Sequence, residues 1–299
     1  MKNTRYAFSR GLRGRTGLRR SALAALACLL ASPQLLAQDY NYLTIRVPGS
    51  QETWATDINA RGDIVGVSFD SEGIARGFLW RKRVFTTIEH PTAVGLEARA
   101  INARGDIAGI LNDSTGAHGF LLSNGRFTVI NRPHASYTFA FGLNNAGDVV
   151  GHSDAGDYIF RDGQFRRAPS SVRDIQDNGR VTVGVTEAPG GYAGFISRKH
   201  DEVELIELPN LPVPCSVVRG INQRGDMVGG FVYISADEEC VPLSGDAHGF
   251  VLRDREFTRI DFPGAQATEA MAINDDGVIV GRFVNRDGQV LGFRAKPKN

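Results

Sequence analysis

Cysteine is scarce in this chain: there are three in 299 residues, and only Cys215 and Cys240 lie beyond residue 37. Sustained helical patterns are missing too, since no later stretch keeps the apolar spacing of an amphipathic helix. The motifs of serine-hydrolase elbows, zinc proteases, P-loops and dinucleotide-binding turns do not occur. These absences exclude a helical fold and the enzyme classes that such motifs identify.

Metal-binding patterns are equally weak. Two cysteines with no neighbouring histidine make an incomplete zinc site. The stretch NDDG at 274–277 resembles the start of a calcium loop but lacks the later acidic ligands. We therefore expect no metal and no cofactor.

The first 37 residues have the layout of a secretory signal peptide. Seven basic residues and no acidic residue accompany the apolar run at 21–30, which ends before it reaches the roughly 20 residues of a membrane span. We expect cleavage after Ala37 and a location in the bacterial periplasm or outside the cell. A twin-arginine signal at Arg19 and Arg20 and a lipoprotein signal at Cys28 are weaker alternatives.

Removal of residues 1–37 changes the charge of the chain. The full sequence has 34 basic and 33 acidic residues, and the leader takes seven of the basic ones. The remaining chain carries 27 basic against 33 acidic residues, a net charge of about −6. We therefore expect no nucleic-acid partner and no membrane insertion after signal removal.

One ten-residue motif recurs along the chain. DINARGDIVG at 57–66 returns as AINARGDIAG at 100–109, and DIQDNGRVTVG at 174–184 is a degenerate copy with Gln176 in place of asparagine. The motif asparagines are Asn59, Asn102, Asn144, Asn222 and Asn274. The six copies are 43, 42, 32, 46 and 52 residues apart, which is typical of a repeat architecture. Asn and Gly at these positions indicate a hairpin turn, with a ligand role for Asn as the alternative.

Each repeat contains four short apolar runs separated by turn residues. In the first copy they are ATDIN, DIVGVSF, RGFLW and VFTTI, within 55–88. Such runs predict β-strands, and units of four strands predict the blades of a β-propeller. The last repeat stops after its third strand, at 291–299, while an isolated fourth strand opens the mature chain at 42–53. We predict an all-β, six-bladed propeller over residues 38–299, closed by this N-terminal strand.

The repeats resemble a known bacterial family. HGF, followed by FTRIDFPGA at 257–265 and by an IN-containing turn, is similar to the extracellular HAF repeats over nearly all of residues 41–295. The copies around YIFRDGQF and DIQDNG depart from the pattern, so the fourth blade is the least regular. The resemblance implies an exported β repeat protein and transfers no activity.

The two remaining cysteines lie in links of the fifth repeat that a four-stranded blade places on one face. An oxidising compartment favours a Cys215–Cys240 disulfide. This bridge would hold the long insertion at 233–246 and stabilise the fold by roughly 3 kcal/mol.

Positions that differ between the repeats are the candidate site, because shared positions build the scaffold. Two residues before the motif Ile or Leu, the copies carry Thr56, Arg99, Phe141, Arg173, Arg219 and Met271. Four residues before it they carry Trp54, Glu97, Phe139, Ser171, Val217 and Glu269. We expect these side chains to surround one opening of the central channel.

Arg99, Arg173 and Arg219 would form a guanidinium cluster for a carboxylate, sulfate or phosphate group. Glu97 and Glu269 would act as acid and base, or would neutralise the arginines in an internal ion-pair ring. Trp54, Tyr137, Phe139 and Phe141 add aromatic ligand-binding surface. Candidate proton-transfer histidines in links on the same face are His90, His134 and His152. His118 and His248 occupy the shared AHGF position and are interpreted as structural.

These features favour a monomeric ligand-binding protein for an anionic small molecule or an acidic glycan. The first alternative is a lyase or hydrolase on an anionic substrate, in which arginine binds the anion and Glu or His moves the proton. The second is a structural protein of the cell envelope. The sequence leaves open whether the protein is an enzyme.

Overall fold

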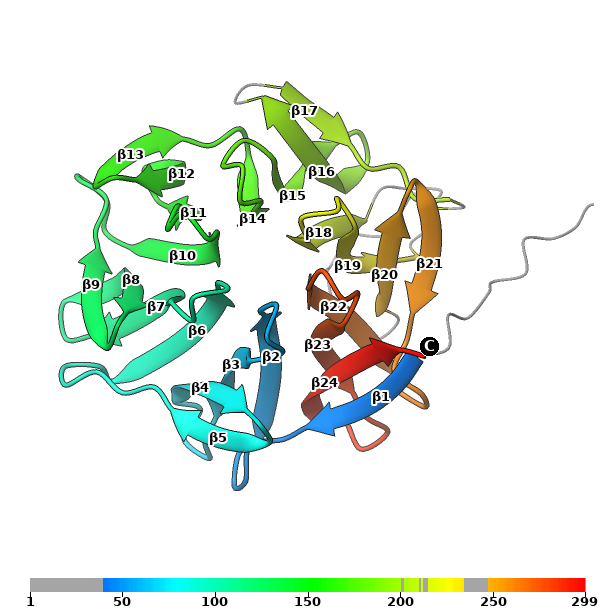
Figure 1. The fold of residues 1–299 in the computed structure, drawn as a ribbon, viewed down its shortest axis with the longest axis horizontal. Coiled ribbons are helices and arrows are strands. Elements are labelled where there is room, and N and C mark those ends of the chain that lie inside the picture. Colours follow the sequence, from blue (N-terminus) through cyan, green and yellow to red (C-terminus); the bar gives the residue numbers. More distant parts are fainter. Residues whose placement is uncertain (1–39, 200–201, 210, 212–214, 234–246, 299) are drawn as a thin grey trace, which may run out of the picture. The chain divides into compact units, whose positions relative to one another are not determined.

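In the described residues, twenty-four strands form six four-stranded antiparallel sheets arranged as blades in a ring (Figure 1). The computed structural model describes residues 40–199, 202–209, 211, 215–233 and 247–298. Within these residues, no helix is long and apolar enough to cross a membrane. The predicted six-bladed β-propeller is confirmed, and the expected signal peptide lies outside the described residues.

The first three blades follow the chain from the centre of the ring outward. Blade one contains β2 (Glu52–Ile58), β3 (Ile64–Phe69), β4 (Ala75–Arg81) and β5 (Val84–Thr87). Blade two contains β6 (Gly95–Ile101), β7 (Ile107–Asp113), β8 (Gly116–Ser123) and β9 (Arg126–Ile130). Blade three contains β10 (Thr138–Leu143), β11 (Val149–Ser153), β12 (Gly156–Arg161) and β13 (Gln164–Arg167).

The last three blades include the degenerate fourth repeat, which also forms four strands. Blade four contains β14 (Ser171–Ile175), β15 (Thr182–Ala188), β16 (Gly191–Lys199) and β17 (Glu202–Leu205). Blade five contains β18 (Ser216–Ile221), β19 (Met227–Val232), β20 (Ala247–Arg253) and β21 (Glu256–Ile260). Blade six contains β22 (Ala267–Ile273), β23 (Ile279–Val284), β24 (Val290–Pro297) and β1 (Tyr40–Ile45).

Blade six is closed by the first strand, as the sequence predicts. β1 pairs antiparallel with β24, with Tyr42 opposite Ala295 and Ile45 opposite Gly292. The ring therefore joins its two ends inside one sheet, where β1 pairs with the edge of β24 that would otherwise lack a partner strand.

The repeated Gly-Phe strand supplies the core between the blades. Phe78 is 2% exposed and packs over Gly66 of the neighbouring strand. A Cβ added at Gly66 would lie 2.0 Å from the Trp54 carbonyl oxygen and 2.5 Å from the Phe78 ring. The glycine that ends each motif is therefore required by the close approach of backbone and aromatic ring.

The motif asparagine links each blade to the next. Asn59 Oδ1 accepts hydrogen bonds of 3.0 Å from the backbone N–H groups of Arg61 and Asp63, which closes its own turn. Its Nδ2 donates to the carbonyl oxygen of Asn102 in blade two at 3.2 Å. The same bond recurs around the ring from Asn102, Asn144, Gln176, Asn222 and Asn274, and the last returns to Asn59. We call these six residues the amide ring.

Gln176 shows why the fourth copy departs from the motif. Its turn is one residue longer, since Gln176 N–H donates to the carbonyl of Val181, and Asn178 Oδ1 accepts the turn N–H groups instead. The longer glutamine side chain still reaches the Asn222 carbonyl at 2.6 Å. One residue thus keeps the blade-to-blade bond while another closes the turn.

Each inner strand carries a β-bulge at the same place. Register shifts occur across Thr56, Arg99, Phe141, Arg173, Arg219 and Met271. These are the residues two positions before the motif Ile or Leu, where the repeats diverge. Bulges locally bend a strand and redirect a side chain, so the scaffold presents its variable residues from the one irregular point of each inner strand.

Candidate functional site

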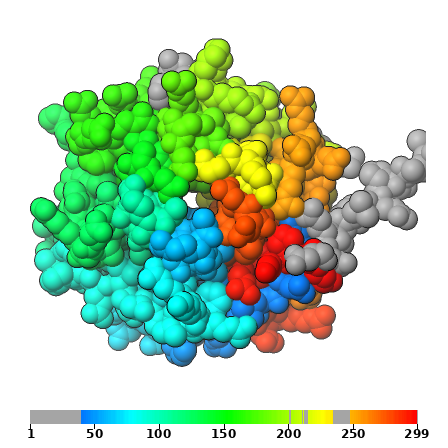
Figure 2. Space-filling view, viewed as in Figure 1, coloured from blue at the N-terminus to red at the C-terminus, as the bar shows by residue number. Residues whose placement is uncertain are grey.

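The variable residues gather around one end of the central channel, which we call the mouth. The ring leaves a narrow opening at its centre, visible in Figure 2 where blue, green, yellow and orange segments meet. The mouth contains Trp54, Glu97, Arg99, Phe139, Phe141, Arg173, Arg219 and Glu269, joined by Arg282 from β23. The amide ring lies at the other ends of the same inner strands.

Glu269 forms the most buried ion pairs of the mouth. Its side chain is 1% exposed, and it accepts hydrogen bonds from Arg219 Nε at 2.7 Å and from Arg282 Nε at 2.9 Å. Burial alone would raise the pKa of Glu269, but the charges of the two arginines outweigh burial and lower the pKa. Glu269 is therefore ionised at neutral pH and neutralises arginine, as the ion-pair alternative expects.

Arg99 is paired in a similar way. It donates to Glu97 of its own strand, and its Cζ lies 5.8 Å from the centre of the Trp54 ring. Arg282 lies closer to the same ring, at 4.1 Å. Burial lowers the pKa of Arg99, while the charge of Glu97 opposes that shift. Trp54 thus lies between two cations that already have carboxylate partners.

Arg173 is different, because no carboxylate in the described part of the chain lies within ion-pair distance of it. Its Nε is buried without a hydrogen-bond partner, and its Cζ lies 4.6 Å from the Phe141 ring centre. Burial, followed by the charge of Arg219, lowers the pKa of Arg173 to about 10, so the group remains a cation at neutral pH. The mouth therefore holds one guanidinium that lacks a carboxylate partner.

Arg173 lines a pocket of about 640 Å³ between blades four and five. Hydroxyl groups and a second guanidinium accompany it, from Ser170, Ser171, Thr186, Tyr192 and Arg219. Asp157 and Glu187 are the acidic lining residues. The Tyr192 side chain is 44% exposed, which leaves an aromatic ring open to solvent at this pocket. Cation, hydroxyl and aromatic groups in one cavity suit a hydroxylated anion.

His152 connects this pocket to the aromatic residues of blade three. Its Nδ1 lies 3.0 Å from Asp157 Oδ1, and its Nε2 lies 3.2 Å from the Tyr137 hydroxyl. The Asp157 carboxylate accepts a hydrogen bond, so Nδ1 carries a proton, and in the neutral imidazole Nε2 can accept from Tyr137. Tyr137 in turn stacks on Phe139, with ring centres 4.7 Å apart. An oriented histidine beside a tyrosine hydroxyl is an arrangement that can transfer a proton.

Two carboxylates lie in the channel between the mouth and the amide ring. Asp57 of blade one accepts hydrogen bonds from the backbone N–H groups of Ile58 and Ile101, and Asp174 of blade four accepts from two equivalent groups. Burial raises the pKa of Asp174 to about 7. Burial, together with the charge of Asp174, raises the pKa of Asp57 well above its ordinary value. Neither residue is among the site positions predicted from the sequence.

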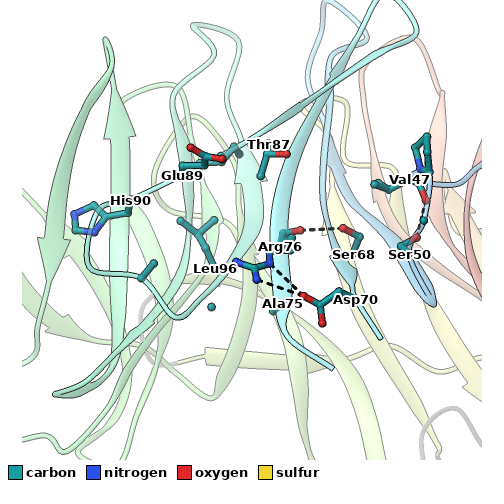
Figure 3. A pocket seen from close by; sticks show the side chains of 15 residues that line it. Val47, Ser50, Ser68, Asp70, Ala75, Arg76, Thr87, Glu89, His90 and Leu96 are labelled. Carbon is teal, nitrogen blue, oxygen red and sulfur yellow. Dashed lines mark hydrogen bonds and ion pairs between the residues drawn. The ribbon is translucent and has the colours of Figure 1, made fainter. Parts of the chain in front are cut away.

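Other predicted residues do not join the mouth. His90 lines a separate cavity of about 540 Å³ with Glu89 and the Arg76–Asp70 ion pair, and its ring points away from that pair (Figure 3). It contacts Phe127 at 4.8 Å between ring centres. His134 is exposed, with a left-handed backbone φ of 66°. Thr56, at a variable position, donates to the Ala98 carbonyl at 2.8 Å and is structural.

The two histidines of the shared AHGF position have carboxylate partners. His118 lies 3.2 Å from Asp113, and His248 lies 3.2 Å from Asp261. These contacts fit their structural interpretation.

Arg282 and Asp157 are members of the site that sequence reasoning missed. Arg282 lies opposite Glu269 in the register of β22 and β23, and His152 lies opposite Phe139 at the equivalent position of β10 and β11. Arg282 and His152 each come directly after the glycine of the second strand in their blade. At this position the other copies carry Val67, Ile110, Val185 and Gly230. Comparing the repeats at this position as well would have selected Arg282.

Cys215 is described, but Cys240 lies outside the described residues. The Cys215 side chain is 2% exposed and packs with Val232, Ala247 and Ala267. The predicted disulfide remains a prediction. Among the described residues, no group of three or more His, Cys, Asp or Glu side chains is placed to hold a metal ion.

Comparison with known proteins finds only distant structural similarity. Neither a protein-family profile nor a curated protein matches the chain. A catalytically inactive variant of virginiamycin B lyase from Staphylococcus aureus, solved with quinupristin, matches with 10% identity over 86% of this chain and 99% of that one, at a TM-score of 0.46. A triple-arginine mutant of AofleA from Arthrobotrys oligospora matches with 12% identity over 85% of each chain, at a TM-score of 0.48.

Proposed function

We propose that the protein binds a carboxylated ligand, such as an acidic glycan or a small organic acid, at the mouth. The observation that carries the proposal is Arg173, a cation in a pocket of about 640 Å³ without a carboxylate partner in the described structure. A guanidinium that already has a partner gains little from a ligand anion, whereas Arg173 has an Nε–H and a charge to offer.

Three further features support a hydroxylated ligand. Hydroxyls of Ser170, Ser171 and Thr186 line the pocket and can exchange hydrogen bonds with sugar hydroxyls. The exposed ring of Tyr192 offers an apolar face for a sugar ring. Arg219 lines the same pocket but already donates to Glu269. A ligand carboxylate would therefore depend mainly on Arg173.

A thermal-shift titration with oligogalacturonate and with small carboxylates tests this proposal. Binding to the folded state raises the melting temperature of the parent protein, and this rise should disappear in Arg173→Met. Arg166→Met on the exposed strand β13 is the matched control, because it removes one positive charge away from the pocket. Equal stabilisation of the parent and Arg173→Met by every ligand would contradict the proposed site.

A second candidate function is elimination from a carboxylated substrate, and it rests on the Asp157–His152–Tyr137 chain. Arg173 would hold the carboxylate while His152 and Tyr137 take the proton from the adjacent carbon. The bond from the next carbon to the leaving oxygen then breaks, and that oxygen takes up a proton from Tyr137 or water. An unsaturated product, detected by its ultraviolet absorbance and lost in Tyr137→Phe, would favour this function. New reducing ends without unsaturation would indicate a hydrolase.

We also propose that the chain is an exported protein of the HAF type, bridged between Cys215 and Cys240. The leader composition and the quoted repeat motifs support this proposal. Intact mass of protein from the periplasmic fraction should show cleavage after Ala37 and a gain of about two daltons on reduction. The envelope-protein alternative gains support from the paired residues Glu97, Arg99, Arg219, Glu269 and Arg282. It does not account for Arg173.

A further inference from the structure

The turns on the face opposite the mouth enclose a basic groove of about 680 Å³. Its cationic lining residues are Arg61, Arg81, Lys82, Arg83, Arg104 and Arg294. They come from blades one, two and six, and Asp63 is the one acidic residue that lines the groove with them. This concentration of positive charge contrasts with the excess of acidic residues in the chain after residue 37. We call it the turn-face groove.

Asp63 does not neutralise the whole groove. Its carboxylate accepts a two-point contact from Arg81, at 3.0 Å to each oxygen, and a further bond from Arg61 at 3.1 Å. Arg104 is paired separately with Asp106 at 2.7 Å. These contacts hold three guanidinium groups in place. The other three cations of the groove do not form an ion pair with Asp63.

Lys82, Arg83 and Arg294 have no carboxylate partner in the described part of the chain. Arg294 Nε is buried and has no hydrogen-bond partner, and its Cζ lies 5.8 Å from the centre of the Trp80 ring. Burial, and then the charge of Arg83, lower the pKa of Arg294. Arg83 and Arg294 thus place two like charges in one groove, and neither has a carboxylate partner among the described residues.

The backbone that carries Lys82 and Arg83 is strained. The turn between β4 and β5 places both residues in the left-handed region, with φ of 50° and 66°. The equivalent turns of blades two and three use Asn124–Gly125 and Asp162–Gly163, the residue types that this hairpin turn favours. Side chains as bulky as Lys and Arg are uncommon there, and such strain is concentrated at functional sites.

We propose that the turn-face groove is a second binding site, which takes a phosphate or sulfate ester group. Arg83 and Arg294 would supply the guanidinium contacts that lack an acidic partner in the free protein, and Lys82 would add a third positive charge. Guanidinium groups match the oxygen geometry of such tetrahedral anions through paired hydrogen bonds. The anion would also relieve the repulsion between Arg83 and Arg294.

The arrangement favours a single anionic group over a nucleic-acid strand. The cations surround one cavity instead of following a line of successive phosphates. Trp80, the aromatic residue that lines the groove, is 7% exposed and already contacts Arg294, so it offers no face on which a base could stack. The ester group can belong to a free metabolite or to a glycan, and both sources share this chemistry.

Calorimetric titration of the protein without its leader tests the proposal, with inorganic phosphate and sulfate as probes and acetate as the reference. We expect phosphate or sulfate to bind, and the double variant Lys82→Asn with Arg83→Gly to weaken binding about tenfold or more. The same variant should melt at a higher temperature, because it removes the strained turn. Arg294→Met should also weaken binding, and it leaves the strained turn in place.

Blade five supplies the matched control, since Asp254 and Arg255 adopt the same left-handed turn with φ of 47° and 68° and do not line the groove. Asp254→Asn with Arg255→Gly should raise the melting temperature and leave phosphate affinity unchanged.

Unchanged affinity in both groove variants would overturn the proposal, as would an equal loss in the blade-five control. A single-stranded oligonucleotide that binds much more tightly than phosphate would also overturn it, in favour of a nucleic-acid surface. If phosphate or sulfate binds as expected, comparing the affinities for a sugar phosphate and for a sulfated glycan would distinguish a free metabolite from a glycan as the source of the ester.

Discussion

The two ends of the central channel are built from the same six strands, but the blades are alike at one end and differ at the other. At the amide ring, six equivalent residues make the same bond from each blade to the next. At the mouth, six equivalent bulge positions carry four different residue types, and one of the three arginines among them, Arg173, has no carboxylate partner in the described structure. In this molecule, repetition marks the residues that hold the ring together, while the divergent positions carry both paired residues and Arg173, which we propose binds a ligand.

The largest effect is expected at the paired side of the mouth. Glu269→Ala leaves Arg219 and Arg282 without their buried carboxylate, so the free energy of unfolding should fall by about 3–5 kcal/mol in urea denaturation. Glu97→Ala is the comparison, because the side chains of that pair are 20% and 17% exposed and solvent screens them better. A loss at Glu269 no larger than that at Glu97 would show that deeper burial does not make the Glu269 pairs the more stabilising ones.

A smaller loss is expected from the amide ring. Asn102→Ala removes the bond to Asn144 and two bonds that close its own turn, at a cost of about 2 kcal/mol by chemical denaturation. Gln176→Asn shortens the one side chain that must span a longer turn and should cost about 1 kcal/mol. If Gln176→Asn were stabilising, the explanation of the degenerate repeat would be wrong.

The carboxylates between the two ends predict a dependence of stability on pH. The pKa of Asp174 is raised to about 7, so the folded state binds more protons than the unfolded state between about pH 4 and pH 7. The stabilising contribution is full below about pH 4 and is lost as the pH rises through 7. Melting temperatures should therefore fall from about pH 5 to pH 8, and Asp174→Asn should flatten this decline. The charge of Asp177 also raises the pKa of Asp174, and the raised pKa of Asp57 predicts the same direction of pH dependence.

The smallest effect on stability is expected at the ligand side of the mouth. Arg173→Met removes a cation that has no carboxylate partner and keeps an apolar stem over Phe141, so the free energy of unfolding should change by less than about 0.5 kcal/mol. Thermal unfolding without ligand measures this change. A loss comparable to that of Glu269→Ala would assign Arg173 to the scaffold.

The architecture was predictable because the turn motif recurs at a regular spacing and the chain ends complement each other. The strand at 40–45 was recognisable as the missing strand of the last repeat, since 257–268 carries the same pattern. The variable positions of the inner strand were equally visible. The structure shows a β-bulge at every one of these positions, and the sequence of a single copy does not predict it.

The pairing of charges could not be predicted in the same way. Whether Arg99, Arg173 or Arg219 lacks a partner depends on cross-strand register and on contacts between blades, and the partner Arg282 comes from a strand outside the stacked set. Asp57 and Asp174 were hidden because four of the six residues at their position are Ala or Gly. The turn-face groove combines residues from three blades, and no single repeat reveals it.

The most direct test of the account is a crystal structure of the protein with a bound carboxylated sugar such as galacturonate. The account predicts that the carboxylate lies within hydrogen-bond distance of Arg173 in the pocket between blades four and five, with Glu269 still paired to Arg219 and Arg282. A carboxylate bound elsewhere on the ring, with the Arg173 pocket empty, would contradict the assignment of the mouth as the ligand site.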